Sequence, residues 1–239
     1  MSAPDKSQRV NPVESVIRAR RTSKVLLPVE LREEQQSRWT SEHADELQCM
    51  LDTAAWAPFH KKVHEHHISA DLDSPMPWRF HVLGPEACTR LLSYLEQQAH
   101  ADTDPKWNRA WQSKIKDMIS GCGVLIQATW LPDPIEPGVD ASADQAIVEF
   151  THKNIEHVAA ASSAVQSLLL AAESRQWLSY WSSGGILRDD DVFDFIGISS
   201  SEQLLGSVFL TPQAHARSRI LEGSLREQRG DQSGWVRWV

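Results

Sequence analysis

The segment from residue 154 to residue 175 constrains the fold of this chain more than any other. Its residues favour a helix, and around 158–161 and 168–172 the side chains are largely small and apolar on every side. A helix that is apolar all round belongs in the centre of a domain or in an interface between subunits. The sequence therefore predicts a long, buried central helix.

The rest of the chain mixes helices and strands without the regular alternation of a parallel α/β fold. Apolar residues at helical spacing predict helices at 12–20, 41–57, 86–100, 105–119 and 190–195. Alternating or continuous apolar runs predict strands at 78–83, 124–130, 177–181 and 204–210. The polar stretches 59–76 and 131–142 predict loops. We therefore expect an α+β fold with a central antiparallel or mixed sheet flanked by helices.

The length and charge of the chain limit the classes of function. A chain of 239 residues can bury one sizeable core, so we expect a flexible N-terminal segment at 1–11 and a single domain at 12–239. With 24 basic and 32 acidic residues the formal net charge is −8. This charge argues against partners that are nucleic acids or anionic membranes, because both require a basic surface. Anion binding must then depend on a local cluster of cations.

Cysteine usage and the absence of targeting signals predict a cytoplasmic protein. The three cysteines, Cys49, Cys88 and Cys122, form no CxxC pair, which fits a reducing compartment. The first twelve residues contain no apolar core of a signal peptide. No continuous apolar run reaches the roughly 20 residues that a membrane span requires.

One basic cluster stands out near the N-terminus, where Arg20, Arg21, Thr22, Ser23 and Lys24 follow one another at the end of the first predicted helix. Cations at that position complement the helix dipole, which is one interpretation. The other is a phosphate clamp, because arginine offers a bidentate fork, lysine a point charge and the hydroxyls further hydrogen bonds. The residues by themselves leave both open.

The order of motifs along the chain resembles the nitroreductase family from about residue 12 to residue 220. The basic cluster comes first, then an Ala-Pro turn at 57–60, a Pro-Trp-Arg-Phe strand start at 77–80, a Trp-Ser-Ser-Gly turn at 181–184 and a closing strand at 205–213. The resemblance implies a nitroreductase-like fold in a homodimer that binds FMN at the subunit interface. Each motif is weak alone, and the five in family order are more specific.

The resemblance also implies which residues contact the cofactor. Arg20, Arg21 and Thr22 match positions at the FMN phosphate, ribityl chain and ring edge, with Lys24 nearby. Two further groups of residues match positions beside the flavin. The first is Trp56 and His60, around the Ala-Pro turn, and the second is Trp181, Ser182 and Ser183, in the later turn. Further phosphate-binding cations are expected at Arg217 and Arg219.

This chain departs from the family pattern between the Ala-Pro turn and the Pro-Trp strand. Residues 61–76 form an apparent insertion of about a dozen residues, here called the insertion. Met76 replaces the Asn or Gln that the family usually places before Pro77 and commonly uses at the flavin or substrate. These departures place the choice of substrate in doubt.

The resemblance implies an FMN-dependent oxidoreductase with a ping-pong mechanism. NADH or NADPH would reduce the flavin and leave, and an electron-poor small molecule such as a nitroaromatic or a quinone would then be reduced. The catalytic chemistry is the flavin's, so no catalytic residue is assigned, and His60, Trp56 and Trp181 are candidates for shaping the pocket. Two alternatives stay open. One is a flavoenzyme with a dedicated metabolite, such as an oxidase, desaturase, dehalogenase or flavin-consuming enzyme, and the other is a non-catalytic flavin-binding dimer.

No metal site is expected. The run His64-Glu65-His66-His67 is not HExxH, because Ile68 occupies the place of the second histidine. Glu149 and His152 have the spacing of half a di-iron motif, but no second copy follows. A polar loop beside the active site and a solvated helix start are the preferred interpretations.

Overall fold

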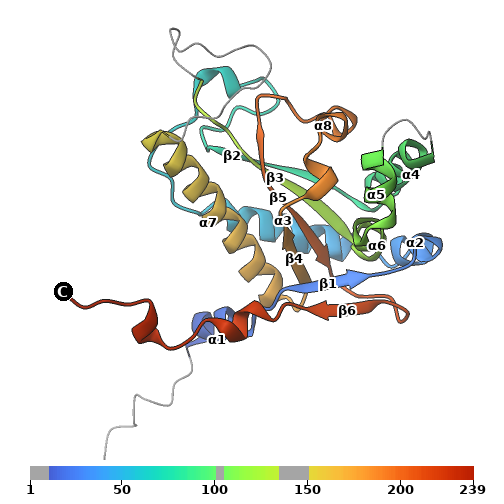
Figure 1. Ribbon diagram of the computed structural model, residues 1–239. Coiled ribbons are helices and arrows are strands. Elements are labelled where there is room, and N and C mark those ends of the chain that lie inside the picture. The colour runs from blue at the N-terminus through green and yellow to red at the C-terminus, as the bar shows by residue number, and fades with distance from the viewer. Residues whose placement is uncertain (1–10, 101–104, 135–150) are drawn as a thin grey trace, which may run out of the picture.

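The centre of the structure is a four-stranded antiparallel sheet. The computed structural model describes residues 11–100, 105–134 and 151–239, and Figure 1 shows its ribbon. Across the sheet the strands lie in the order β2 (Trp78–Leu83), β3 (Val124–Trp130), β5 (Gln203–Thr211) and β4 (Leu178–Ser182). Each strand is antiparallel to its neighbour. The four predicted strands are confirmed.

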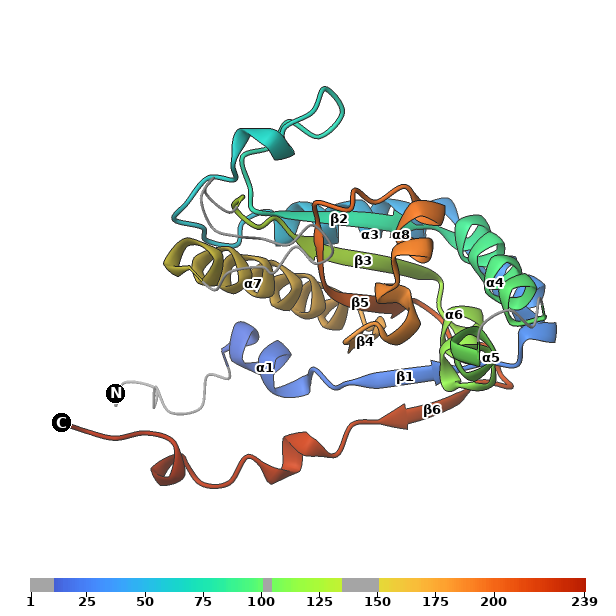
Figure 2. The ribbon, with the colours of Figure 1, turned by 45° about the horizontal axis from the view of Figure 1, so that its top comes forward.

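Helices cover both faces of this sheet (Figure 2). One face packs against α4 (Pro85–His100), α5 (Pro105–Gln112) and α6 (Lys114–Gly121), and the other against α3 (Ser41–Ala54) and α7 (His152–Ser174). In β3, Leu125 enters the first core, whereas Val124 and Ile126 enter the second. Burial on both faces explains why this strand is a continuous apolar run in the sequence.

The predicted helix at 105–119 is wrong in one respect, since two helices occupy its place. α5 ends at Gln112 and α6 begins at Lys114. Between them Ser113 has extended backbone, and its hydroxyl accepts a hydrogen bond from Ile115 N at 3.2 Å. A serine side chain that caps a helix start in this way competes with continuation of the preceding helix.

The predicted central helix is confirmed as α7, but it is buried on one side rather than all round. Ala164, Val165 and Leu168 are fully buried against the sheet, whereas Ile155 is 50% exposed. Among the described helices α7 is long and apolar enough to cross a membrane, but half of the relevant window is buried inside the protein. Such burial is typical of a core helix.

A second, two-stranded sheet lies apart from the first and was not predicted. β1 (Ser23–Leu26) pairs antiparallel with β6 (Arg219–Glu222), so residues nearly 200 positions apart lie side by side. In Figures 1 and 2 this ribbon continues at one end into α1 (Pro12–Ala19) and into the C-terminal residues, which project away from the central sheet. Strand β1 is largely buried, whereas α1 has no buried residue and β6 is mostly exposed.

Short elements complete the fold. Asn11 caps α1 with its side chain, and the rest of the predicted flexible segment at 1–11 lies outside the described residues. The predicted short helix near 190 is confirmed as α8 (Asp190–Ile196), which ends at Gly197 in left-handed conformation, φ 84°. The remaining elements are α2 (Arg32–Gln36) and the 3-10 turns Val29–Leu31, Glu65–His67, Gly185–Arg188, Leu225–Gln228 and Gln232–Gly234.

Candidate functional site

The basic cluster at residues 20–24 spans the end of α1 and the start of β1. α1 ends at Ala19, and Arg20 is its C-cap, whose N–H donates to Val16 O at 2.9 Å. From Ser23 onward the backbone belongs to the β1–β6 ribbon. The prediction that the cluster lies at a helix end holds for Arg20 only, because strand pairing with β6 takes the last residues of the cluster into a sheet.

The cations of this cluster are held in different ways. Lys24 Nζ lies 4.5 Å from the centroid of the Tyr180 ring on β4, a cation–π contact. Arg21 forms an exposed ion pair with Glu227 at 3.5 Å. Arg226 donates to the carbonyl of Arg20 at 2.8 Å and thereby secures the end of α1. The cluster therefore lies between strand β4 and the C-terminal residues.

Antiparallel pairing brings Arg219 to the ribbon, and Arg217 lies two residues before β6 begins. Leu26 pairs with Arg219, and Lys24 pairs with Leu221. Because alternate residues of a strand share a face, Lys24 and Arg219 lie on the same face of the ribbon. Both Arg217 and Arg219 are exposed. We call β1, β6 and the five cations Arg20, Arg21, Lys24, Arg217 and Arg219 the basic ribbon.

The turn at residues 181–184 begins with the last two residues of β4, the strand that touches the basic ribbon. Trp181 pairs with Val208 and its indole packs over Gly206, while Ser182 Oγ accepts a hydrogen bond from Gly184 N at 3.2 Å. Gly184 has φ 101°, a conformation that L residues rarely adopt. The exposed carbonyl of Ser183 accepts from Arg188. The turn is thus held in one shape by its own hydrogen bonds.

The structure does not bring Trp56 and His60 into contact with these residues. Both follow the C-terminal end of α3, and both are exposed, Trp56 to 89%. Phe59, between them, packs edge-on against Trp78 with ring centroids 5.8 Å apart. Within the described residues no hydrogen bond, ion pair or ring contact joins Trp56 or His60 to the basic ribbon or to the turn after β4. Within one copy of the chain, the predicted cofactor residues therefore form two separate groups.

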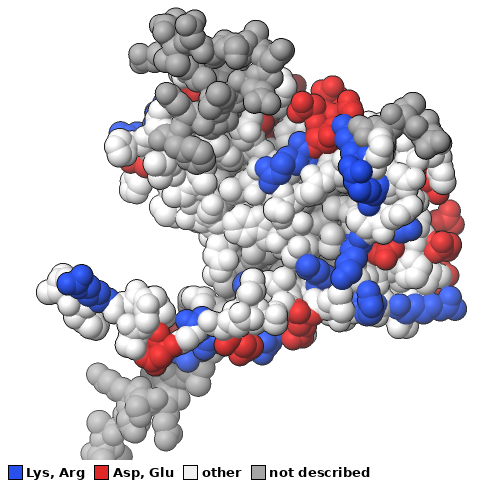
Figure 3. Space-filling view, in the orientation of Figure 1, with Lys and Arg blue, Asp and Glu red and all other residues white. Residues whose placement is uncertain are grey.

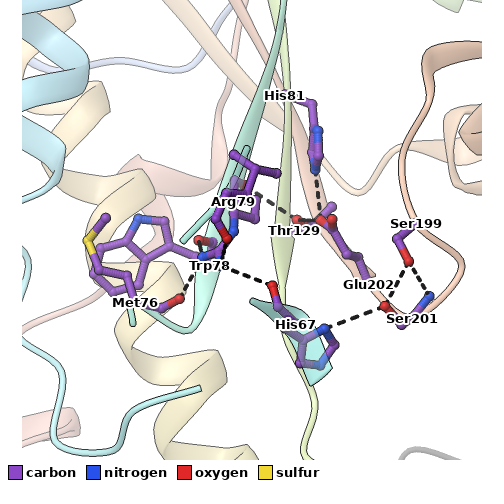
Figure 4. A network of polar contacts seen from close by, with 10 residues as sticks. His67, Met76, Trp78, Arg79, His81, Thr129, Ser199, Ser201 and Glu202 are labelled. Atoms are coloured by element: carbon purple, nitrogen blue, oxygen red, sulfur yellow. Dashed lines mark hydrogen bonds and ion pairs between the residues drawn. The ribbon is translucent and has the colours of Figure 1, made fainter. Parts of the chain in front are cut away.

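A buried polar network, which sequence reasoning missed, lies at the other end of the sheet (Figure 4). Glu202 is buried just before β5 and accepts hydrogen bonds from His81 Nε2 at 2.7 Å and from Thr129 Oγ1. Burial by itself would raise the pKa of Glu202, but these hydrogen bonds and the positive charge of Arg79 outweigh it and lower the pKa. Glu202 is therefore ionised at neutral pH.

Arg79 joins this network to the insertion. Arg79 as a whole residue is 6% exposed. Its guanidinium donates hydrogen bonds to backbone carbonyls of the chain segment that precedes β2. Burial lowers the pKa of Arg79, while the carboxylates of Glu202 and Asp73 raise it. Sequence reasoning used Arg79 only as part of the Pro-Trp-Arg-Phe motif, and no pattern in the sequence signalled these contacts.

The histidine run in the insertion forms hydrogen bonds to protein atoms. His64 Nδ1 and His66 Nδ1 are 2.7 Å apart, and His67 Nε2 donates to Pro132 O at 2.7 Å. Over the described parts of the chain, no three His, Cys, Asp or Glu side chains are grouped so that they could hold a metal ion. Glu149, of the di-iron half-motif, lies outside those parts.

An antiparallel sheet between two layers of helices, joined to a ribbon of clustered cations, defines an α+β protein with a candidate phosphate-binding edge. The chain belongs to the nitroreductase family, whose family model matches residues 43–210. The predicted family and the nitroreductase-like fold are confirmed. A comparison with curated protein sequences gives no match.

Solved structures with the same fold are distant in sequence. A nitroreductase-like family protein from Bacillus cereus has a TM-score of 0.58 and 18% identity, covering 97% of this chain and 98% of that chain. A nitroreductase with bound FMN from Bacteroides fragilis has a TM-score of 0.57 and 17% identity, covering 96% and 100%. A third, also with bound FMN, from Desulfitobacterium hafniense, has a TM-score of 0.53 and 14% identity, covering 96% and 99%. At these identities the likeness establishes the fold.

The residues of the basic ribbon fit the phosphate of a flavin mononucleotide. In a chain whose net charge is −8, Arg20, Arg21 and Lys24 lie at or near the α1 end of the ribbon. Arg219, paired with Leu26, and the preceding Arg217 lie toward its other end. Only Arg21 among them is paired with a carboxylate by an ion pair within the described residues. Arginine and lysine donors are the groups that bind a phosphate dianion most strongly, and the neighbouring hydroxyl of Thr22 adds a further donor.

Proposed function

We propose that this protein is an FMN-dependent oxidoreductase that passes electrons from NADH or NADPH to an electron-poor small molecule such as a quinone or a nitroaromatic. The observation that carries the proposal is the basic ribbon, which contacts strand β4 through Lys24 and Tyr180 in a chain of the nitroreductase family. FMN in two solved structures of this fold supports the choice of cofactor. The donor and the acceptor follow from the family resemblance.

The chain's own residues would bind and orient the cofactor. Arg20, Arg21 and Lys24 would bind the phosphate, with Thr22 donating from its hydroxyl. Arg219 on β6 and Arg217 just before it would add positive charge from the other end of the ribbon. Lys24 would exchange its cation–π contact with Tyr180 for a phosphate oxygen. The turn at residues 181–183 would face the flavin ring. When bound, FMN supplies the hydride chemistry, and the protein supplies position and electrostatics.

We further propose that two copies of the chain form the functional unit. α1 has no buried residue, and its apolar Val13 and Ile17 are 64% and 51% exposed. Trp235 and Trp238, near the C-terminus, are exposed as well. Figure 3 shows the surface hollowed between the main body and the projecting α1 and C-terminal residues. A second copy seated there would cover these apolar residues and could bring its own Trp56 and His60 to the basic ribbon.

The first experiment is a visible spectrum of the purified protein, followed by addition of FMN to any colourless fraction. We expect flavin absorbance that bleaches when NADH or NADPH is added and returns when duroquinone, a single-ring quinone, is added. Protein that remains colourless with added FMN would refute the cofactor assignment. Flavin that binds but accepts no electrons from either nucleotide would instead favour a non-catalytic flavin-binding dimer.

The second copy is tested by sedimentation of the full chain and of a Trp235→Ala, Trp238→Ala variant. We expect a dimer for the full chain and a weaker dimer for the variant, because truncation removes two large apolar side chains from the proposed interface. A Trp56→Ala variant in the same experiment tests whether the turn after α3 takes part. A monomeric full chain at micromolar concentration would contradict the proposal.

The insertion favours a second candidate, a flavoenzyme of the same fold with one dedicated acceptor. Residues 61–76 form an ordered segment that is hydrogen-bonded to β2 and to the loop before β5. Met76 is apolar where the family usually has a polar residue. Negligible turnover with quinones and nitroaromatics by a yellow, reducible protein would support this candidate over a broad-specificity reductase.

A further inference from the structure

The insertion is a closed loop whose two ends are joined. Val63 N donates to Pro75 O at 3.1 Å, and Val63 is buried. Within the loop, Ser69 N donates to Leu72 O at 3.3 Å. His67 ties the loop to two other segments, through Pro132 O at 2.7 Å and the hydroxyl of Ser201 at 3.4 Å.

One side chain, Arg79, makes most of the remaining hydrogen bonds between the insertion and the sheet (Figure 4). Its Nη1 donates to Met76 O and Trp78 O, each at 2.8 Å. Its Nη2 donates to Ser74 O at 3.0 Å and lies 3.4 and 3.5 Å from the carbonyls of Leu72 and His67. A single guanidinium therefore gathers the carbonyls of both halves of the loop.

A buried carboxylate opposes the positive charge of Arg79. The side chain is buried on edge strand β2, and Glu202, held by His81 and Thr129, supplies the opposing negative charge. A planar guanidinium with several fixed donors can serve carbonyls in different directions at once, which a lysine ammonium on a flexible stem cannot. The arrangement favours arginine specifically.

The loop held in this way forms one wall of a solvent-open cavity of about 300 Å³ against α3 and β2. Its exposed walls are mostly apolar and come from Leu51 and Ala55 near the end of α3, Leu72 and Met76 in the insertion, and Trp78 and Phe80 on β2. The polar residues Asp71, Asp73, Ser74 and Arg79 complete the lining. The cavity extends to the end of α3, where the lining residue Ala55 directly precedes the exposed Trp56. Ligand pockets in proteins range from about 300 to 1,000 Å³, so this cavity suits one aromatic ring better than a fused system.

We propose that Arg79 is a positioning residue that sets the shape of the insertion, and that the cavity so formed binds a small, apolar, single-ring acceptor. The role in electron transfer rests on the proposed function, in which a second copy brings the cavity beside its Trp56 to the flavin on the partner's basic ribbon. The contacts of Arg79 and the binding of a ring compound do not depend on it. Arg79 lines the cavity, but its Nη atoms are engaged by backbone carbonyls, so we assign its effect on the acceptor to the loop that it holds.

Hydrogen exchange on the flavin-free protein tests the positioning role. Arg79→Met retains the aliphatic volume and removes every donor, so amides at residues 63–76 should exchange at least about tenfold faster, whereas the core of β3 should not change. Arg79→Lys should restore part of the protection. The matched control is Arg90→Met, which removes the same charge from an exposed position on α4. Unchanged exchange in Arg79→Met would overturn the positioning role.

Binding of duroquinone tests the cavity, with quenching of tryptophan fluorescence as the readout on the flavin-free protein. We expect weaker binding in Arg79→Met by about tenfold and no change in Arg90→Met. Leu51→Trp, which fills the cavity from the α3 side and leaves the Arg79 contacts intact, should abolish quenching even if Arg79→Met fails to fold. Undiminished duroquinone binding in Leu51→Trp would show that the cavity is not the site.

Kinetics of the flavin-loaded protein separate this proposal from the function on which it rests. Arg79→Met should raise KM for duroquinone by about tenfold with kcat at saturation and FMN affinity within twofold of the wild type, because the loop shapes the acceptor site only. A raised FMN dissociation constant would place Arg79 in the cofactor site and overturn the assignment. Protein that binds duroquinone in the cavity but never binds FMN would refute the proposed function alone.

Discussion

The indole of Trp181 lies across the backbone of Gly206, on the neighbouring strand of the central sheet. A Cβ atom at position 206 would lie 2.6 Å from Ser182 O and closer still to the indole nitrogen. The register of β5 against β3 shifts at this point, since Ala128 pairs with Gly206 and Thr129 with Leu204. This bulge and the glycine together make room for the tryptophan beside the candidate flavin turn.

Gly206→Ala should destabilise the protein by about 1–3 kcal/mol, the usual cost of forcing an extra group into a packed site. Trp181 and the carbonyl of Ser182 must move, so affinity for FMN should fall as well. Urea unfolding followed by fluorescence measures the first effect. Gly84→Ala is the control, because a Cβ there meets no atom within 4 Å. Equal stability of the two variants would contradict the packing account.

Removing Arg20 and Arg21 together should weaken FMN binding by several kcal/mol, since charge-assisted hydrogen bonds contribute about 1.5–3 kcal/mol each. Fluorescence titration of the flavin gives the dissociation constants. The control is Arg90→Ala with Lys114→Ala, which removes the same charge from exposed helical positions. If both double variants bind FMN equally weakly, net charge rather than the basic ribbon controls affinity.

The stability of the protein should fall as the pH drops below about 6.5, in part through His67. Burial lowers the pKa of His67, only partly opposed by its hydrogen bond to Pro132. The unfolded chain therefore binds the proton first, and the free energy of unfolding rises with pH across this window. Wild type should lose more stability than His67→Gln between pH 7 and pH 5.5, as measured by urea unfolding. Parallel pH profiles would exclude the contribution of His67.

Arg32 should be among the most costly residues to truncate. It is buried beside α6, and its guanidinium donates to Cys122 O at 2.6 Å, to Pro85 O at 2.7 Å and to the carbonyls of Ile119 and Ser120 at 3.2 Å. Arg32→Met leaves these carbonyls without that partner, and we expect a loss of about 3–5 kcal/mol. Thermal or urea unfolding against Arg90→Met checks this. A loss below about 1 kcal/mol would show that water replaces the guanidinium.

Elements with strong local patterns were predictable from the sequence. The buried strand β3 and the central helix α7 are long apolar segments, and their positions follow from those runs of apolar residues alone. Thr40 caps α3 as a helix-start residue should, through its bond with His43 N. The basic cluster and the Trp-Ser-Ser-Gly turn were recognised by their order along the chain, and the structure places both beside β4.

The roles of Arg79 and Arg32 were not predictable, because their partners are backbone carbonyls. Every residue carries a carbonyl, so no sequence pattern marks the ones that an arginine will gather. The pair His81 and Glu202 was equally hidden, since 121 positions separate them. The break between α5 and α6 depends on one serine side chain, which a periodicity argument does not weigh.

The sequence by itself determined the helices and strands of the core, the family and the candidate cofactor residues, because apolar periodicity and motif order are local properties of the chain. Only the tertiary structure decided that the basic cluster enters a ribbon with β6, that α7 keeps one side uncovered, and that Trp56 and His60 lie apart from the cations. These features depend on which distant segments pair. Pairing is set by the packing of the whole molecule. A four-residue strand such as β1 forms only because its partner β6 lies beside it.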